Sequence, residues 1–513
     1  MKAKYDDDDV FPKDRRLLAD AIHRLQAGED MPDLTIRLRT AEGNFIWCKL
    51  TITVLRESGG GDERLLVTIN DVDDFIQTQQ ALAYRAEYDP LTGYSNFDRF
   101  KRDVAGLLAK RGNRLYSLWY SDLKNFKYIN DIYGYGVGDQ VLQYWASVIA
   151  TDTRDGETLA RISADNFTVF RYYETRGELE QRFHRIERLL MEFAGLKNKK
   201  FPVELVSGIY CIESDEDTLS VEDMLDRANM AQKSVKYLGG SRMAFYTEQM
   251  RSRVIREKAM EAEMVSALTG REFCVYLQPQ VDIQHGFTTA GAEALVRWVR
   301  PGRGLVPPMD FIPLFEKNGF IVDLDQYVFE TVCQLLHRRR EEGRSMFHIS
   351  VNVSRLSIFQ TDFVERYTGI KDRYGIPDGI LAQQFTETIA VESVGYISRI
   401  ARELQRRGFL LSMDDFGSGY SSLNVLKDLT VDILKLDIGF FQNGLAASRD
   451  RAIVASIIAM AGVLNMKVVA EGIEAAEQVA FLRETGCDVI QGYIFSKPMP
   501  MEEFAADTKY NPL

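Results

Sequence analysis

Eight short apolar runs in the second half of the chain each end in a polar side chain that could hold a metal ion, a phosphate or a proton. Most are separated by a stretch with the apolar spacing of a helix. The runs are Phe273–Gln278, Ala290–Glu293, His348–Asn352, Phe385–Glu387 with Gln384 at its start, Leu410–Asp415, Ile433–Asp437, Val468–Glu471 and Val489–Gln491. Strand followed by helix, repeated in this way over about 240 residues, predicts a (β/α)8 barrel of the TIM type.

The polar groups at these run ends are carboxylates, one amide ligand and one lysine, and histidine is absent from them. In such a barrel the C-terminal strand ends converge on one mouth, so residues far apart in the sequence would meet there. Oxygen ligands favour hard divalent cations such as Mg²⁺, Mn²⁺ or Ca²⁺ over zinc or copper. The pattern therefore predicts a metal site at the mouth of the barrel.

Composition narrows the classes of protein that fit. The 513 residues allow about three or four domains of ordinary size, and a net charge of −12 disfavours nonspecific nucleic-acid binding. The five cysteines are scattered, as expected of buried thiols in a reducing compartment. Met1–Asp9 is polar and no apolar run reaches the roughly 18–20 residues of a membrane span. We therefore expect a cytoplasmic protein without a membrane span.

The N-terminal segment alternates apolar and polar residues over Leu34–Arg39, Phe45–Val54 and Leu65–Asp71, which predicts antiparallel strands. A helix over 76–88 would follow. This pattern resembles the C-terminal half of a PAS sensor domain, so residues 1–75 are interpreted as a partial PAS-like α+β unit that leads into a signalling helix. A small packing module without a ligand explains the same pattern equally well.

Residues 89–245 have the mixed pattern of an α/β domain, with a strand over Leu115–Asp122 and a hairpin around 163–166. Residues 246–262 have the charge and spacing of a linker helix. The barrel domain would then occupy residues 263–513.

Four segments follow one another near the start of the middle domain. They are Tyr88–Asn96 (YDPLTGYSN), Asp122–Lys127 (DLKNFK), Asn130–Asp131 (ND) and Gly134–Asp139 (GYGVGD). Their order and content resemble the GGDEF domain of the diguanylate cyclases. The resemblance implies a nucleotide-cyclase-like α/β fold for residues 89–245.

The catalytic hairpin departs from the family pattern. Where Gly-Gly-Asp-Glu-Phe is expected, Ser163–Phe167 reads SADNF. Side chains in place of the two glycines obstruct close approach of a phosphate, and Asn166 lacks the charge of the family's glutamate. Lys124 and Gly240 replace a further aspartate and an arginine. The resemblance therefore implies a degenerate domain that makes no cyclic dinucleotide.

Nucleotide binding by the middle domain stays open. Asp122 matches a metal ligand of the family, and Asn130 and Asp139 match the positions that read guanine. One interpretation is a regulatory site that responds to GTP as an effector. The other is a structural relic.

Six motifs in the predicted barrel occur in order at strand ends. They are Glu293–Trp298 (EALVRW), Asn352–Ser354 (NVS), Asp414–Leu423 (DDFGSGYSSL), Asp432–Asp437 (DILKLD), Glu471–Glu474 (EGIE) and Gln491–Tyr493 (QGY). They resemble the EAL domains, which are phosphodiesterases of cyclic di-GMP. The resemblance implies hydrolysis of one phosphodiester bond of cyclic di-GMP, which gives the linear dinucleotide.

The same resemblance implies a site with two metal ions, Mg²⁺ or Mn²⁺. Glu293, Asn352 and Asp414 would hold one ion, and Asp415 and Glu471 would help to hold the second. Two ions about 3.5–4 Å apart activate a water molecule and neutralise the charge of a phosphoryl transition state.

Four further residues complete the implied site. Lys435 would stabilise charge that develops near the attacking water. Gln278, Arg297 and Gln491 would bind the phosphate and guanine edges of the substrate. With the metal-site acids Glu293, Asp415 and Glu471, Lys435 forms the predicted catalytic group.

The fourth strand departs from the family's E-[IL]-T-E-S. It reads Gln384–Thr388 (QFTET), so a glutamine stands where the family has a metal-binding glutamate. Gln384 can offer a carbonyl oxygen as a ligand but no charge, which should weaken metal binding. Glu387 matches the glutamate that holds the mobile loop in place.

Three functions remain after these comparisons of motifs. The first is a cyclic di-GMP phosphodiesterase regulated by an inactive GGDEF domain, and the second is a cyclic di-GMP receptor with weak or no catalysis. A scaffold with neither property is the third. The family also implies a homodimer formed through the EAL domain near Phe416–Ser422, and a signalling partner that the sequence does not identify.

Overall fold

The computed structural model describes residues 7–27, 29, 33–55, 64–193, 203–213, 219–417, 426, 429–440 and 448–506. The chain divides into two compact units, residues 1–253 and 254–513. The division falls within one helix, α8 (Glu248–Thr269), which contains residues 248–262 of the predicted linker.

The first unit begins with a small antiparallel sheet of three strands. These are β1 (Leu34–Arg39), β2 (Phe45–Leu55) and β3 (Arg64–Asp71), in the order β1–β2–β3. Ile36 and Leu50 on one face of the sheet pack with Leu18 of α1 (Arg15–Gln26). A helix, α2 (Asp73–Arg85), follows the sheet as the spacing predicts. The PAS-like interpretation itself stays a prediction.

A five-stranded sheet forms the rest of the first unit, in the order β5–β6–β4–β7–β8. Its strands are β4 (Leu115–Lys124), β5 (Thr158–Ser163), β6 (Asn166–Tyr173), β7 (Glu204–Ile212) and β8 (Arg242–Phe245). Its helices are α3 (Phe97–Ala109), α4 (Phe126–Tyr133), α5 (Tyr135–Asp152), α6 (Arg176–Met191) and α7 (Val221–Val235).

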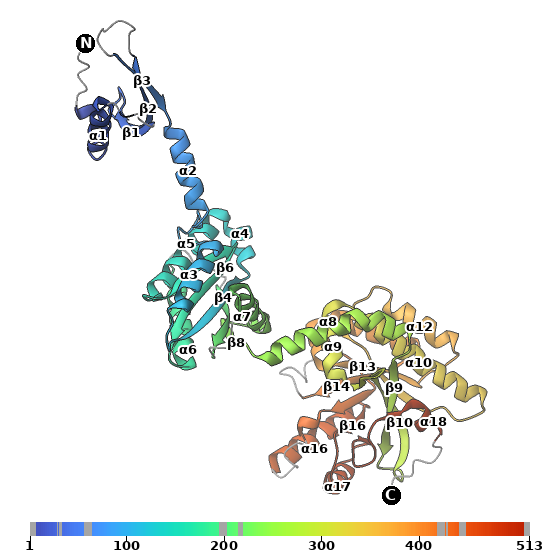
Figure 1. The fold of residues 1–513 in the computed structure, drawn as a ribbon. Helices are drawn as coiled ribbons and strands as arrows, with labels where there is room; N and C mark the ends of the chain where they lie inside the picture. Colours follow the sequence, from blue (N-terminus) through green and yellow to red (C-terminus); the bar gives the residue numbers. More distant parts are fainter. Residues whose placement is uncertain are drawn as a thin grey trace. The chain divides into compact units, whose positions relative to one another are not determined.

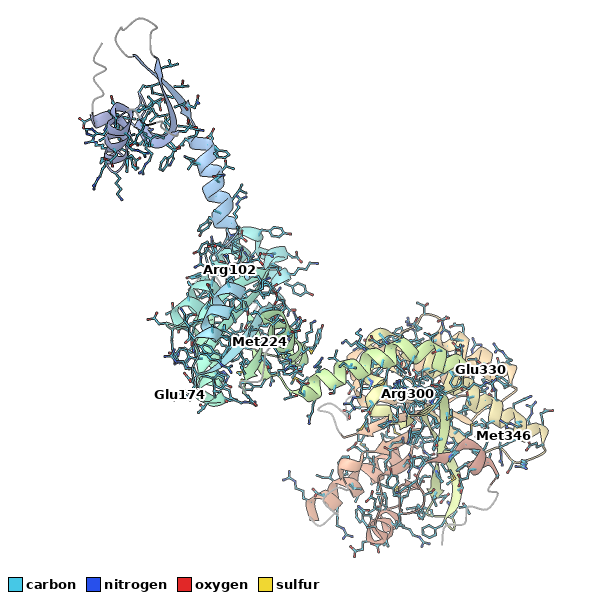
Figure 2. The ribbon with its side chains drawn as sticks, viewed as in Figure 1. Arg102, Glu174, Met224, Arg300, Glu330 and Met346 are labelled. Carbon is cyan, nitrogen blue, oxygen red and sulfur yellow. The ribbon has the colours of Figure 1, made fainter. Side chains whose placement is uncertain are left out.

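Alternate residues of the central strand β4 build two cores, one on each face of this sheet. Trp119 packs with residues of α5 and α6, whereas Leu118 packs with α3 and with Met224 of α7 (Figure 2). Because successive side chains of a strand point to opposite faces, one strand serves both cores. The predicted α/β domain is therefore a sheet covered by helices on both sides.

The second unit is a closed barrel of eight strands (Figure 1). The strands are β9 (Phe273–Asp282), β10 (Thr288–Arg300), β12 (His348–Asn352), β13 (Leu381–Thr386), β14 (Leu410–Phe416), β15 (Ile433–Leu436), β16 (Lys467–Glu471) and β17 (Val489–Gln491). The seven from β10 to β17 are parallel, and β9 closes the ring by pairing with both β10 and β17. Two short strands, β11 (Gly304–Val306) and β18 (Met499–Pro500), pair with β10 and β9.

Helices enclose the barrel strands. They are α9 (Pro308–Asn318), α10 (Ile321–Glu341), α11 (Arg355–Ile358), α12 (Phe363–Arg373), α13 (Glu387–Glu392), α14 (Val394–Arg406), α16 (Ser448–Val463), α17 (Ala476–Glu484) and α18 (Met501–Ala506). The C-terminal part of α8 belongs to this unit as well, since its Glu263 forms an ion pair with Arg300 at the end of β10 (Figure 2).

The expected strand–helix repeat is wrong at its first step. β9 runs antiparallel to β10, and the turn 283–287 joins them as a hairpin. A parallel pair would need a crossover of a dozen or more residues, and this turn is too short for one. Gly286 and Phe287 both have positive φ, +88° and +57°, which reverses the chain.

Below the mouth, part of the inside of the barrel is apolar. Ala382, Leu410, Ile433, Val469 and Val489 form a cluster contributed by five strands. Because side chains alternate along each strand, residues two positions further along point to the same side. This cluster therefore forms a floor under the polar residues at the strand ends.

Candidate metal and phosphodiester site

The barrel places eight of the predicted residues, one from each strand, at its C-terminal rim. They are Gln278, Glu293, Asn352, Gln384, Asp414, Lys435, Glu471 and Gln491. Register explains the gathering: Glu293 lies opposite Gln278, Asn352 beside Gln384, and Glu471 beside Gln491. These eight side chains therefore do meet at one rim of the barrel, as the sequence interpretation requires. The role of each residue stays a prediction.

Lys435 stands at the centre of this set and is 1% exposed. Its Nζ lies 3.0 Å from Glu293 Oε2 and 3.3 Å from Asp414 Oδ1, and it also forms an ion pair with Glu471. Burial by itself lowers the pKa of an amine, but the facing carboxylates of Glu293, Glu471 and Asp414 outweigh it and raise the pKa of Lys435. The lysine is therefore a fixed cation at neutral pH.

Glu293 receives hydrogen bonds at both of its carboxylate oxygens. Asn352 Nδ2 donates to Oε1 at 2.9 Å, and Gln491 Nε2 donates to Oε2 at 2.5 Å. Burial acts to raise the pKa of Glu293, yet the charge of Lys435 and these amide donors outweigh it and hold the pKa below its usual value. Glu293 is thus an oriented carboxylate that stays ionised.

Glu471 differs from Glu293 in its surroundings. Burial raises the pKa of its carboxyl group above the usual value, Lys435 opposes this rise, and the charges of Glu293 and Asp414 add to it. The site holds more carboxylates than one lysine neutralises. A further cation would therefore be attracted to it.

Asp414 and Asp415 are neighbours in β14, yet both carboxylates face the same region as Glu471. Ligand atoms of these three residues lie within 4.8 Å of one another. The register between β14 and β15 shifts after Met413, and Asp415 has a φ of +54°. A bulge of this kind re-aims a side chain that regular alternation would point away.

Asp415, like Glu471, is more easily protonated than an ordinary carboxyl group. Burial, followed by the charges of Asp414 and Asp437, raises the pKa of Asp415 to about 6. Like charges this close disfavour full ionisation unless a cation lies between them. The group therefore has the composition and spacing of an oxygen-ligand metal site.

Gln384 lies among the same carboxylates as a hydrogen-bond donor. Its Nε2 donates to Glu293 Oε1 at 3.2 Å and to Asp414 Oδ2 at 2.5 Å. Its buried Oε1 has no hydrogen-bond partner among the described residues. The amide nitrogen rather than the predicted ligand oxygen faces the two acids, and a half-turn of the amide would exchange them.

A cleft of about 360 Å³ opens above the rim. It is lined by Gln278, Glu293, Leu295, Asp414, Glu471, Gly472, Glu474, Gln491, Gly492 and Tyr493. Tyr493, which is 56% exposed, and Leu295 are lining residues for which the sequence analysis proposed no role. Both belong to the quoted motifs, so their places in those motifs were the available signal.

Arg297 is not among the residues that line this cleft. Its guanidinium lies 5.8 Å from the ring centre of Tyr276, and its Nη1 donates to Val296 O at 2.9 Å. It is on the same strand as Glu293 and Leu295 but beyond them. Its predicted contact with a phosphate stays a prediction.

Glu387 begins α13 and is 2% exposed. Its Oε2 accepts a hydrogen bond from Gly417 N at 3.2 Å, just after β14 ends. Residues 418–422 of the predicted mobile loop lie outside the described residues. The loop-holding role of Glu387 stays a prediction.

The middle domain has a second cleft, of about 470 Å³, lined in part by Asn130, Asp139 and Asp165. Its expected metal ligand Asp122 is 2% exposed and forms an ion pair with Lys236. The two predicted guanine-reading residues therefore line a common cleft. Asp122 does not line it.

Two substituted residues of that domain, one at the end of β4 and one in the hairpin, have partners of their own. Lys124 forms an ion pair with Glu204 at 2.9 Å, and Asn166 Oδ1 accepts a hydrogen bond from Tyr120 at 2.9 Å. Ala164 has a φ of +43°, a conformation that suits glycine better. The hairpin turn is thus retained with Asp165, but without an acidic side chain at position 166.

Two family models match the chain, one over each of the two domains that contain these clefts. The model described as "Diguanylate cyclase, GGDEF domain" matches residues 86–242, and the EAL domain model matches residues 261–498. The chain belongs to the tandem GGDEF–EAL family. Its EAL domain is the barrel, and its GGDEF domain is the five-stranded sheet.

Two Pseudomonas aeruginosa relatives show the extent of the similarity. Cyclic di-GMP phosphodiesterase NbdA is 32% identical over 86% of this chain and 56% of the relative. Bifunctional diguanylate cyclase/cyclic di-GMP phosphodiesterase MucR is 30% identical over 84% of this chain and 63% of the relative. This GGDEF–EAL chain therefore spans less than two thirds of the length of these relatives.

Among solved structures, "PaMucR Phosphodiesterase, c-di-GMP complex" is 34% identical, with a TM-score of 0.46. The match covers 48% of this chain and 99% of that one. None of the helices in the described part of the chain combines the length and the apolar character that a bilayer span needs.

Proposed function

We propose that the EAL domain is a cyclic di-GMP phosphodiesterase that produces the linear dinucleotide and that the GGDEF domain regulates it without cyclase activity. The observation that carries this proposal is the gathering of Glu293, Asp414, Asp415 and Glu471 around the buried Lys435. An anionic phosphodiester resists attack by water unless cations offset its charge. The excess of carboxylates at the rim is suited to collecting such cations.

The residues present fit divalent metal ions. Carboxylate oxygens of three residues lie within 4.8 Å of one another, and the buried Gln384 Oε1 has no described donor. We propose that Glu293, Asn352, Asp414, Asp415 and Glu471 hold Mg²⁺ or Mn²⁺, with Gln384 as a neutral ligand. When bound, such ions activate water and neutralise charge on the phosphodiester.

The chain's own side chains would position the substrate. Gln278 and Gln491 line the cleft, and Lys435 supplies a fixed charge beneath it that stabilises negative charge on a phosphate oxygen. Arg297 would reach a phosphate from further along β10, where its fork of donors can bind two oxygens. Glu387 would hold the start of the mobile loop through Gly417.

The regulatory domain is proposed to respond to GTP. Asn130 and Asp139 line its cleft and could read a guanine edge, whereas Lys124 and Asn166 leave the metal site of a cyclase incomplete. A structural relic is the alternative. Adding GTP to the product assay below distinguishes them, because a relic would not change the rate.

We further propose that residues 1–75 form a PAS-like sensor and residues 76–88 a signalling helix. The GGDEF domain would then occupy residues 89–245, the linker 246–262 and the EAL domain 263–513. An EAL homodimer, an unidentified signalling partner and a cytoplasmic location belong with these proposals. The negative charge of the chain accords with a small anionic ligand held through metal ions rather than with nucleic-acid binding.

A second function is favoured by one observation. Gln384 bridges Glu293 and Asp414 through its amide. Because this side chain is neutral where the family has a glutamate, the metal site has one negative charge fewer. A receptor that binds cyclic di-GMP with weak or no hydrolysis is therefore the alternative. Such a protein would retain the cleft and its glutamines.

A product assay decides between the two functions. The purified chain is incubated with cyclic di-GMP and Mn²⁺, and the linear dinucleotide is measured by chromatography. The phosphodiesterase is expected to form this product, and Glu293→Ala should abolish it because the ligand at the centre of the rim is lost. Binding of cyclic di-GMP without product would show a receptor instead.

A further inference from the structure

Gln280 is a buried amide one layer below the rim, and the proposed chemistry assigns it no role. It is 4% exposed and lies two residues after Gln278 on the same face of β9. Its Nε2 donates to Gln491 Oε1 at 3.0 Å. The strand that carries Gln491 is the last of the barrel, so this bond joins residues distant in the sequence.

Gln491 uses both ends of its amide within the protein. Its Oε1 accepts from Gln280, while its Nε2 donates to Gln278 Oε1 at 3.1 Å and to Glu293 Oε2 at 2.5 Å. Gln278 in turn donates to Ser496 O at 3.3 Å. The amides therefore form a directed chain from Gln280 through Gln491 to the carboxylate of Glu293, with a branch through Gln278 to Ser496 O.

The direction of this chain matters because an amide has one donor end and one acceptor end. If Gln491 turned over, its oxygen would face the oxygens of Glu293 and Gln278. The donor from Gln280 occupies Gln491 Oε1 and opposes that rotation. Without it, a buried oxygen is left unpaired, which is costly in a dry interior.

We propose that Gln280 is a positioning residue that holds Gln491 with its Nε2 toward Glu293 and thereby orients Glu293 for metal binding. The proposal rests on the metal requirement of the proposed function. Groups that orient a ligand usually change metal affinity by about 10–100-fold when they are removed. Because Gln280 acts through Gln491, we expect a smaller effect, of about threefold to tenfold.

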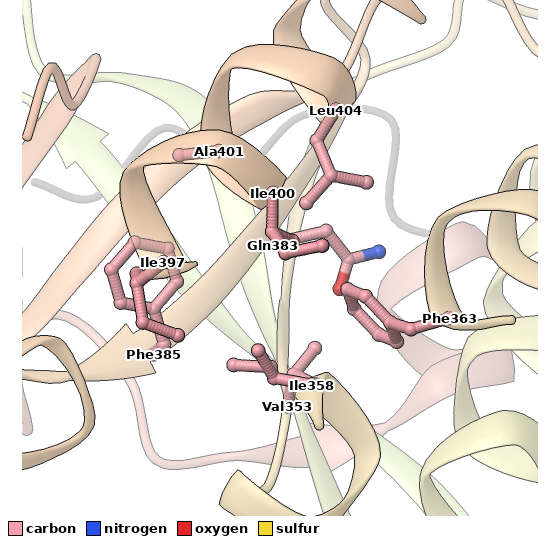
Figure 3. A pocket seen from close by; sticks show the side chains of 9 residues that line it. All are labelled: Val353, Ile358, Phe363, Gln383, Phe385, Ile397, Ile400, Ala401 and Leu404. Atoms are coloured by element: carbon pink, nitrogen blue, oxygen red, sulfur yellow. The ribbon is translucent and has the colours of Figure 1, made fainter. Parts of the chain in front are cut away.

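Gln383 provides a matched control. It is also a buried glutamine of a barrel strand, 1% exposed, but it points outward from β13 into a small cavity among Phe363, Ile400 and Leu404 (Figure 3). Neither its Oε1 nor its Nε2 has a partner among the described residues. Gln383→Met therefore makes the same chemical change as Gln280→Met, but it removes no hydrogen bond from the chain of amides.

The test measures equilibrium binding of Mn²⁺ to the full chain by electron paramagnetic resonance, with Glu293→Ala as the reference for binding elsewhere. Gln280→Met should weaken the site by about threefold to tenfold, and Gln491→Met by about tenfold or more. The double variant should equal Gln491→Met, because Gln280 acts through that residue. Gln383→Met should bind as the wild type does.

Two results would overturn the proposal. One is a Gln280→Met variant with wild-type Mn²⁺ affinity, and the other is a Gln280→Met effect of the same size in the wild-type and Gln491→Met backgrounds. The second would show an action independent of Gln491. Because no turnover is measured, failure to hydrolyse cyclic di-GMP would contradict the proposed function and leave this result standing.

Discussion

The cleft of the GGDEF domain and the cleft of the EAL domain differ in how their charged side chains are paired. In the GGDEF domain two lysines each pair with one carboxylate, Lys124 with Glu204 and Lys236 with Asp122. In the EAL domain one lysine is shared by several carboxylates. A site whose charges are paired within the protein has little need of added cations, whereas a site with surplus carboxylates attracts them.

The largest expected effect concerns the shared lysine. Lys435→Met should reduce hydrolysis of cyclic di-GMP by about 10²–10³-fold, since a fixed charge at the reacting phosphate is lost. Lys124→Met, in the GGDEF domain, should leave the rate within about twofold because the contacts of that lysine, with Glu204 and with Leu238 O, lie within its own domain. Rates of product formation at saturating Mn²⁺ measure both. Equal losses would erase the contrast between the two clefts.

Buried aspartates sharpen the same comparison. Asp152 of the GGDEF domain forms ion pairs with Arg171 and Arg182, whereas Asp325 of the EAL domain accepts from Ser354 N at 2.9 Å and Ser357 Oγ at 2.7 Å. Burial raises the pKa of Asp325 to about 6. Its neighbours help to fix the turn that follows Asn352.

The raised pKa gives Asp325 a defined effect on stability. The folded state holds this proton more tightly than the unfolded state, so unfolding releases a proton between the two pKa values. Stability is therefore lost as the pH rises from about 4 to about 6. The free energy of unfolding of the wild type, relative to Asp325→Asn, should fall by about 2 kcal/mol from pH 4 to pH 7.

Urea unfolding of the full chain at several pH values measures this difference. Wild type and Asp325→Asn share every other titrating group, so subtracting the two curves isolates Asp325. Curves that stay parallel across the range would show that Asp325 titrates normally in the folded protein.

The smallest expected effect concerns the position in each domain where an amide side chain stands in place of the family's glutamate. Gln384→Glu should tighten Mn²⁺ binding by about tenfold, because a charged ligand replaces a neutral amide between Glu293 and Asp414. Asn166→Glu makes the equivalent change in the GGDEF hairpin and should produce no cyclase activity, because Lys124 and Ala164 remain. Calorimetry with Mn²⁺ and an assay for cyclic di-GMP synthesis measure the two variants.

An unchanged affinity in Gln384→Glu would mean that the neutral amide already serves as well as a carboxylate. Synthesis of cyclic di-GMP by Asn166→Glu would mean that the GGDEF hairpin is less degenerate than its paired charges indicate. Either result would weaken the distinction between a closed and an open charge arrangement.

The periodicity of apolar residues in the sequence was enough to predict which polar side chains meet at the mouth of the barrel. Glu293, Asn352 and Asp414 each follow an apolar run that is clear in the sequence, and neighbouring parallel strands bring such positions to the same level of the barrel. The hairpin direction of β9 was not predicted, because the pattern of a strand does not encode its orientation. Its short connection at 283–287 was the available signal.

Finer features depend on contacts that periodicity does not describe. The shared direction of Asp414 and Asp415 depends on a bulge and a positive φ, which arise from pairing with β15. The orientation of the Gln384 amide depends on two acids from other strands. The place of Gln280 beside Gln491 depends on how the barrel closes.

That closure has a mechanical consequence. β9 pairs with β10 along most of its length, but it meets β17 at Val489–Asp282 and Ile490–Val281. The longer ladder is local in sequence and should form early, while the short seam joins the two ends of the domain and should form last. Local opening that starts at this seam, which hydrogen exchange would detect, would loosen the anchoring of Gln491 before the rest of the barrel opens.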